Sequence, residues 1–162
     1  MEKSPIFLYL PIIISLATFA VAYAQMKIAS AKTKLDLYNK RFNIYSLTLE
    51  LYQAFYFKTF DKMNIKIIEF TKAYRESLFL FDKEDGIYDV LSLIQQSASE
   101  ILSYEKLKYE SDVNTSIISQ DLSYKHEIAL KALQNYEIHL ISLEIKISKY
   151  IQFKTKSGWH LF

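Results

Sequence analysis

An uninterrupted apolar segment occupies the first part of the chain. No residue between Ser4 and Met26 is charged, and about 20 apolar residues are enough for a helix to cross the roughly 30 Å hydrocarbon core of a bilayer. Pro11 lies early in this segment, where a helix start or a kink tolerates it. The pattern predicts a transmembrane anchor over residues 1–26.

Two apolar series of helical period follow the anchor. The first has steps of three and four and consists of Leu35, Tyr38, Phe42, Tyr45, Leu49, Tyr52 and Tyr56. One partner helix would not cover this series and its neighbour as well, so this helix needs either two neighbouring helices or an oligomer, and we expect the second series to form an oligomer face. That second series is Leu37, Ile44, Leu51 and Phe55.

Three further helices are expected downstream. Asp61 can cap a helix that extends to Leu78, and the polar run 82–86 reads as a turn. A third helix begins at Ile87 and fades near Glu110, and Ser, Asp, Asn and Thr over 111–119 indicate a loop. The last helix carries a three-four series of Leu133, Tyr136, Leu140, Leu143, Ile147 and Tyr150.

These elements predict an all-α fold: an N-terminal transmembrane helix followed by an antiparallel four-helix bundle over residues 27–157 and a tail over 158–162. The length of 162 residues allows one core beside the anchor. The sequence has two glycines, two prolines and no cysteine. It therefore favours long helices and excludes disulfides, thiol catalysis and thiolate metal sites.

Two segments carry a resemblance to a known group. The run KLDLYNKRFNIY at 34–45 and the runs FLFD at 79–82 and IYD at 87–89 resemble a widespread family of small bacterial single-pass membrane proteins with a K-L-x-L-Y-x-K-R-F-x-I-Y helix. Here Glu76, Ser77 and Leu78 stand where that group often has Arg before Phe-Leu-Phe. The resemblance implies a bacterial source, and it carries no functional residue over.

Cations flank the anchor unequally. Lys3 alone precedes it, and five follow: Lys27, Lys32, Lys34, Lys40 and Arg41. The positive-inside rule then places the C-terminal domain in the cytoplasm, at the bacterial inner membrane. The alternative is a signal peptide, because Ala22-Tyr23-Ala24 has the layout of an A-x-A site, and cleavage at Ala24 would release the domain to the periplasm.

A membrane-surface role is expected for residues at both ends of the bundle. In an antiparallel bundle of four helices, the last one returns to the side on which the first begins. Its C-terminal end and tail would then meet anionic headgroups and the interface. The residues expected at the membrane surface are Lys27, Lys32, Lys34, Lys154, Lys156, Trp159 and Phe162.

Candidate chemistry is sparse. The three histidines lack the i, i+4 spacing of a helical metal site, and no glycine-rich phosphate loop is present, so we expect neither metal nor cofactor. Gln134, Asn135 and His139 resemble the R-N-x-x-x-H motif of HEPN-like proteins, including membrane-linked CRISPR-accessory proteins of the Csx type. Neutral Gln134 cannot stabilise phosphate charge as Arg would, so the resemblance implies a degenerate site.

The sequence therefore favours a membrane-anchored interaction or oligomerisation protein without enzymatic activity. Its expected partners are the lipid bilayer and a second copy or another helical protein, while nucleic acid has little support. Two alternatives stay open: a membrane-acting effector or accessory factor of an antiphage, CRISPR-type defence system, and a degenerate HEPN-like domain that binds or cleaves RNA.

Overall fold

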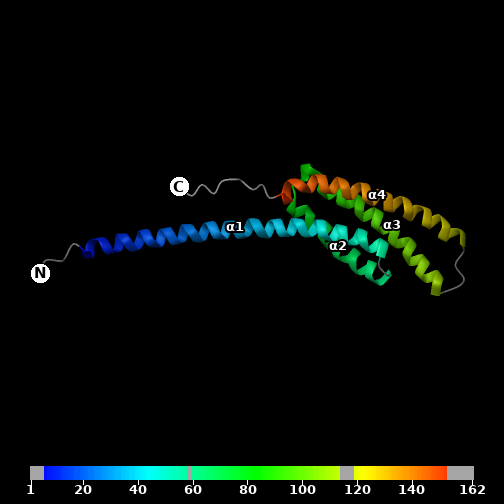
Figure 1. Cartoon of the computed structure of the whole chain (residues 1–162), viewed down its shortest axis with the longest axis horizontal. Coiled ribbons are helices and arrows are strands. Elements are labelled where there is room, and N and C mark those ends of the chain that lie inside the picture. The colour runs from blue at the N-terminus through cyan, green and yellow to red at the C-terminus, as the bar shows by residue number, and fades with distance from the viewer. Residues whose placement is uncertain (1–5, 58–59, 114–118, 153–162) are drawn as a thin grey trace. The chain divides into compact units, whose positions relative to one another are not determined.

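The computed structural model describes residues 6–57, 60–113 and 119–152, and these are almost entirely helical (Figure 1). Within these ranges there is no strand, which confirms the all-α prediction. The helices are α1 (Ile6–Phe57), α2 (Phe60–Leu80), a 3-10 turn (Lys83–Asp85), α3 (Ile87–Val113) and α4 (Ser119–Ile151). The chain divides into two compact units between Tyr38 and Asn39.

The first unit is the apolar part of α1. Its side chains from Tyr9 onward are exposed as far as Asp36, and its hydroxyls bond within the helix: Ser15 Oγ donates to Pro11 O and Thr18 Oγ1 to Ile14 O, each at 2.8 Å. In the described part of the chain, α1 is the one helix long and apolar enough to cross a membrane. Its most apolar 18-residue window has a mean hydropathy of 1.6 and contains no buried residue.

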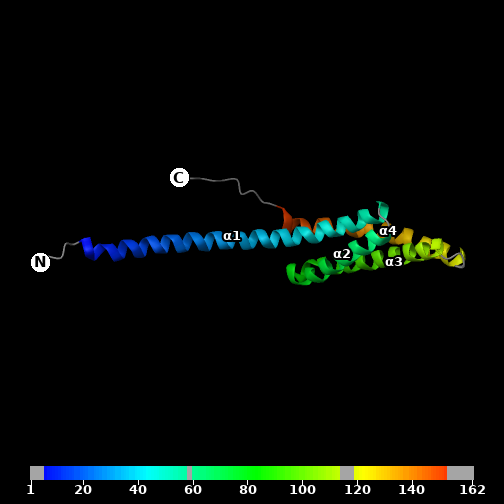
Figure 2. The same cartoon turned by 90° about the horizontal axis from the view of Figure 1, so that it is seen from below.

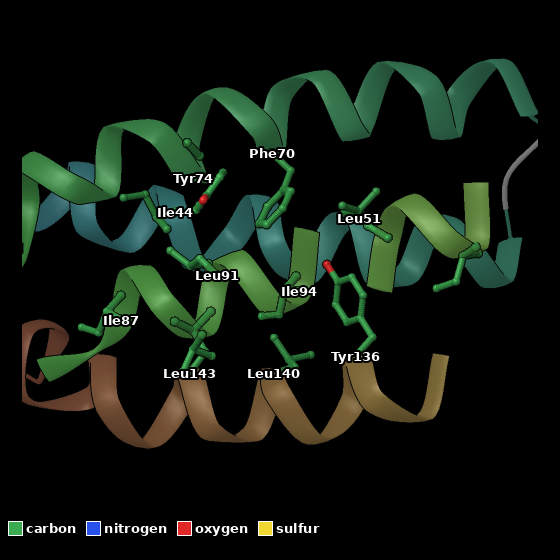
Figure 3. Close-up of a cluster of buried hydrophobic side chains, with 14 of the residues drawn as sticks. Ile44, Leu51, Phe70, Tyr74, Ile87, Leu91, Ile94, Tyr136, Leu140 and Leu143 are labelled. Carbon is green, nitrogen blue, oxygen red and sulfur yellow. The ribbon is translucent and has the colours of Figure 1, made fainter. Parts of the chain in front are cut away.

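The second unit has one hydrophobic core, to which all four helices contribute. Helix α3 packs against both α2 and α4 (Figure 1 and Figure 2). Each fully buried aliphatic or aromatic side chain stabilises the fold by about 1.5–3 kcal/mol. The largest of these core side chains are Ile44, Leu51, Phe70, Ile87, Leu91, Ile94, Tyr136, Leu143 and Ile147, and Figure 3 labels all of them but Ile147.

Tyr136 joins α4 to α1. Its ring lies 5.4 Å from that of Tyr52 and 5.8 Å from that of Phe55, between centroids. Its hydroxyl points to α1 and donates to Thr48 O at 2.8 Å (Figure 3). Burial raises the pKa of the Tyr136 hydroxyl well above its ordinary value, so this donor stays protonated.

The turn between α2 and α3 confirms the prediction for 82–86. Asp85 N donates to Asp82 O and Gly86 N to Lys83 O, which closes the 3-10 turn. Gly86 has a φ of 61°, and its N–H caps the turn. L side chains rarely adopt this φ, so the backbone conformation favours glycine here.

The ends of three helices differ from the sequence prediction. Helix α2 begins at Phe60, so that Asp61 lies in its first turn and does not cap it, and it ends at Leu80 instead of Leu78. Helix α3 extends beyond Glu110 to Val113, and α4 already includes Ser119. The predicted loop 111–119 was therefore too long, and 114–118 lies outside the described residues. Adding a residue to an existing helix gains a hydrogen bond without a new nucleus, so a helix can continue through residues of modest propensity.

The assignment of the two apolar series on α1 was also wrong. Ile44 and Leu51, expected on an oligomer face, are buried in the core, and Phe55 packs against it. In the other series, Phe42 and Tyr56 are exposed. Ile44, Leu51 and Phe55 therefore supply core contacts inside one chain, whereas Leu37 is half-buried and does not belong to the core cluster.

Candidate functional site

A cluster of polar and aromatic side chains gathers at the turn that follows α2. We call it the turn clasp. Its side chains come from α1, from the residues that follow α2 and from the last helical turn of α4, and all except the Phe81 ring have a polar group that faces a partner from another element. The turn clasp consists of Arg41, Phe81, Asp82, Asp85, Lys149 and Tyr150.

Tyr150 is the centre of the turn clasp. Its hydroxyl donates to the Asp85 carboxylate, lies 3.0 Å from Asp82 Oδ2 and accepts from Asp82 N at 3.3 Å. The Tyr150 ring meets the ring of Phe81 edge-on, with centroids 5.1 Å apart. Burial raises the pKa of the Tyr150 hydroxyl, and the hydrogen bond to Asp85 raises it further. The hydroxyl therefore remains a donor at neutral pH.

Asp85 receives two cationic groups of α4. The Lys149 ammonium pairs with its carboxylate, and Lys146 Nζ donates to its main-chain oxygen at 2.9 Å. The hydrogen bond from Lys149, followed by that from Tyr150, lowers the pKa of the Asp85 carboxyl. The hydrogen bond to Asp85 in turn raises the pKa of Lys149. The pair is therefore charged at neutral pH.

Arg41 ties α1 into the same cluster. Its Nε donates to Leu80 O at 2.8 Å, and its guanidinium lies 4.3 Å from the ring centroid of Tyr150 and 5.7 Å from that of Phe81. A cation at the C-terminus of α2 also meets the negative end of the helix dipole. The planar guanidinium can bond a carbonyl and stack on a ring at once, which an ammonium cannot do.

Sequence reasoning missed the turn clasp. This reasoning treated Arg41 as one cation of a basic cluster. It predicted the turn at 82–86 but identified no residue that contacts this turn. The structure brings Arg41, from the segment at 34–45, onto Leu80 and Phe81, from the segment at 79–82. The presence of both segments in one resemblance was the signal that could have linked them.

The ion pair of the turn clasp predicts a stability change in acid. The folded-state pKa of Asp85 lies below its ordinary value of 3.8. Its contribution is therefore complete above that value and is lost as the pH falls through the folded-state pKa. We expect the difference in unfolding midpoint between wild type and Asp85→Asn to be smaller at about pH 3 than at about pH 6, with the loss occurring below the ordinary pKa of 3.8. Thermal unfolding followed by circular dichroism measures it.

The exposed pair of Glu127 and Lys131 supplies the control. The two residues are one helical turn apart on α4, with Nζ and Oε1 separated by 2.8 Å. Exposed pairs of this kind contribute little, so Glu127→Gln should leave the midpoint nearly unchanged at both pH values. A constant difference between wild type and Asp85→Asn across the pH range would contradict the role given to the Asp85 charge.

The HEPN-like candidates are only partly brought together. Asn135 and His139 line one cleft of about 160 Å³ between α3 and α4, together with Glu100 and Gln96. Gln134 is exposed and is not among the residues that line it. The position that would hold the motif's cation is therefore neutral and lies outside the cleft, and RNA chemistry at this site stays a prediction.

The residues expected at the membrane surface fall in two places. Lys27, Lys32 and Lys34 are exposed on α1, and Lys27 Nζ lies 5.0 Å from the ring centroid of Tyr23. Their contact with headgroups stays a prediction. The remaining four lie outside the described residues: Lys154, Lys156, Trp159 and Phe162.

A second surface feature is an open apolar groove on α2. It has a volume of about 630 Å³, and Gln95 of α3 completes its wall. Phe79 at one end is 85 % exposed, and Ile68 is 69 % exposed. The lining residues are Ile67, Ile68, Thr71, Lys72, Arg75, Glu76, Phe79 and Gln95.

Groups of three or more side chains suited to a metal ion are absent from the part of the chain that the structure describes. Comparison of the chain with protein-family models, with curated proteins and with solved structures finds no match.

Proposed function

We propose that this chain is a single-pass membrane protein whose helical domain works by association with other proteins and not by catalysis. The observation that carries the proposal is the exposed apolar window of α1, with a mean hydropathy of 1.6 and no buried residue. An isolated apolar helix surface of this length is costly in water and stable in a bilayer.

Polar groups inside this helix support the membrane assignment. Every backbone and side-chain polar group in hydrocarbon needs an internal partner, and the hydroxyls of Ser15 and Thr18 find theirs one turn back along α1. The cations at Lys27, Lys32 and Lys34 favour a cytoplasmic position for the residues that follow.

The proposed domain is an antiparallel four-helix bundle. In support, the core side chains of α3 and α4 run in opposite sequence order: Ile87 lies near Leu143, while Ile94 lies toward Tyr136 (Figure 3). The polar connections of the turn clasp tie the end of α2 to α1 and α4 at one end of the proposed bundle.

Exposed apolar side chains support association as the mode of action. Phe79 and Ile68 border the α2 groove, and Ile138, Ile141 and Ile145 are exposed on α4. Soluble surfaces rarely gather large apolar side chains in contiguous patches unless a partner covers them. The expected partners are a second copy of the chain or a helical protein.

Membrane fractionation of the full chain tests the anchor. We expect the wild type to resist alkaline carbonate extraction, and a phosphatase fused after Phe162 to be inactive. Replacing Ile13 and Leu16 by lysine should release the chain into the soluble fraction, because each lysine near the centre of a membrane helix costs about 2.5–3.5 kcal/mol.

The matched control is Ile28→Lys. Ile28 is as exposed on α1 as the other two but lies beside Lys27, outside the uncharged run, so the variant should stay in the membrane. Extraction of the wild type by carbonate, or a mature chain that begins at Gln25, would refute the anchor. An active phosphatase fusion would refute the cytoplasmic orientation.

A further inference from the structure

The outward face of α4 carries three isoleucines in a row. Ile138, Ile141 and Ile145 are 62 %, 52 % and 71 % exposed, while the opposite face of the same helix lies in the core. Their steps of three and four place them at positions a, d and a of a heptad. We call this apolar row the α4 seam. Its residue spacing is that of the apolar contact line between two paired helices.

Charges flank the α4 seam with opposite signs. In the same heptad, Glu137 and Glu144 take position g on one side, and Lys149 takes position e on the other. When two parallel helices pair, a residue at g faces the residue five positions later, at e of the partner. Glu144 of each copy would then face Lys149 of the other, giving two pairs by symmetry.

An antiparallel arrangement lacks this complementarity. It places position g of one copy against position g of the other, so that the acidic side chains Glu137 and Glu144 would face one another. Like charges across a helix interface are destabilising and set orientation. The charges beside the α4 seam therefore fit a second, parallel copy of the same helix.

Both charged groups retain bonding capacity for a partner. Glu144 accepts from the Tyr45 hydroxyl through Oε1 at 2.9 Å, and its Oε2 has no partner among the described residues. Lys149 uses one of its three donors on Asp85, and its side chain is 54 % exposed. An intermolecular pair can form without breaking the turn clasp.

We propose that two copies of this chain associate through a parallel pair of α4 helices. This inference rests on the proposed function and names its partner and its surface. A seam of three isoleucines is short beside the roughly 20–30 residues per side of a stable interface. Anchoring in one bilayer gives both copies the same orientation and raises their effective concentration, so a short parallel seam is sufficient there.

Disulfide formation in membranes tests the geometry. The chain has no cysteine, so single replacements give unique thiols. In the full chain, Ile138→Cys, Ile141→Cys and Ile145→Cys should each form a disulfide-linked dimer under mild oxidation, because a parallel pair places each residue opposite itself. Ile65→Cys is the control, as an isoleucine 56 % exposed on α2 and outside the α2 groove. Dimer at fewer than two of the three α4 positions, or equal dimer at position 65, would overturn the proposal.

Charge reversal tests the flanks. Glu144→Lys should lower the dimer yield of Ile141→Cys about five-fold, because two attractive pairs become repulsive. Glu137→Lys lies on the same side of the α4 seam but faces Ser142 of the second copy in this geometry, and it should leave the yield unchanged. An equal loss with both variants, or with neither, counts against the parallel register.

Energy transfer between copies labelled after Phe162 separates the two proposals. Transfer without the α4 disulfides would overturn the α4 pair and leave association in place. If neither energy transfer nor the α4 disulfides are observed while the chain stays in membranes, the α4 pair and self-association are both overturned.

Discussion

Truncation of Tyr136 to alanine should lower the free energy of unfolding by about 3–5 kcal/mol, the range for loss of a large aromatic side chain from a core. The Tyr136 side chain is fully buried, and it contacts the rings of Tyr52 and Phe55. Its removal leaves a cavity between α4 and α1 and takes the hydroxyl donor away from Thr48 O. Urea unfolding of the full chain in detergent, followed by circular dichroism, measures the loss.

Two further variants separate the contributions to this stability loss: the cavity, the lost hydrogen bond and the removal of a tyrosine from a surface position. Tyr136→Phe keeps the ring and removes the bond to Thr48 O, so it should cost only about 1 kcal/mol. Tyr124→Ala removes the same side chain from an exposed site on α4 and should change stability by less than about 0.5 kcal/mol. Equal losses at positions 124 and 136 would contradict the placement of Tyr136 in the core.

Replacement of Arg41 by alanine should destabilise the second unit by about 2 kcal/mol, from the loss of a charged hydrogen bond and of two ring contacts at a half-buried site. The variant leaves Leu80 O without its guanidinium partner and exposes a face of the Tyr150 ring. Arg41→Lys should recover little of this loss, because an ammonium cannot both stack on the ring and bond the carbonyl in the same geometry. Urea unfolding measures both variants.

Arg75 provides the control for Arg41. It also lies over an aromatic ring, with its guanidinium 5.2 Å from the centroid of Tyr74, but its side chain is exposed. Arg75→Ala should therefore cost less than about 1 kcal/mol. If Arg41→Ala is as mild as Arg75→Ala, the turn clasp does not hold α1 to the end of α2.

Local patterns predicted the helices and the turn well. On α4, the three-four series placed Tyr136, Leu140, Leu143 and Ile147 on one face, and all four are buried. The polar run 82–86 was recognised as a turn from its Asp and Gly residues, and in the structure Gly86 has a positive φ. Such features depend on residues close together in sequence, so their periodicity and chemistry are visible before any packing is known.

The same reasoning failed on α1 because the tyrosine side chain is amphipathic. The series containing Tyr45 and Tyr52 looked like a core stripe, yet both rings lie at the edge of the core with their hydroxyls bonded to Glu144 and Tyr56. An aromatic ring packs on apolar neighbours while its hydroxyl stays at the surface. Because tyrosine was counted as fully apolar, the tyrosine-containing series was expected to form the core face of α1. Ile44 and Leu51 were therefore assigned to an oligomer face and not to the core.

The turn clasp could not be predicted from the sequence for a different reason. Tyr150 is 65 positions from Asp85 along the chain, and Arg41 is 39 positions from Leu80. No periodicity or spacing rule connects residues so far apart. The α4 seam, in contrast, is visible in the sequence, but its exposure could be recognised only once the other face of α4 was seen in the core.

Tyr136 and Tyr150 lie in α4, so they are synthesised after the three helices whose core they complete. A ribosome completes α1, α2 and α3 before it adds either tyrosine, so the nascent chain holds Ile44, Leu51, Phe70 and Leu91 without the helix that covers them. The anchor of the proposed membrane protein is synthesised before α2, α3 and α4 and would already be at the bilayer during this interval. Closure of the domain therefore waits for the synthesis of α4, and a chain stalled within α4 would present an open apolar core beside the membrane to chaperones and proteases.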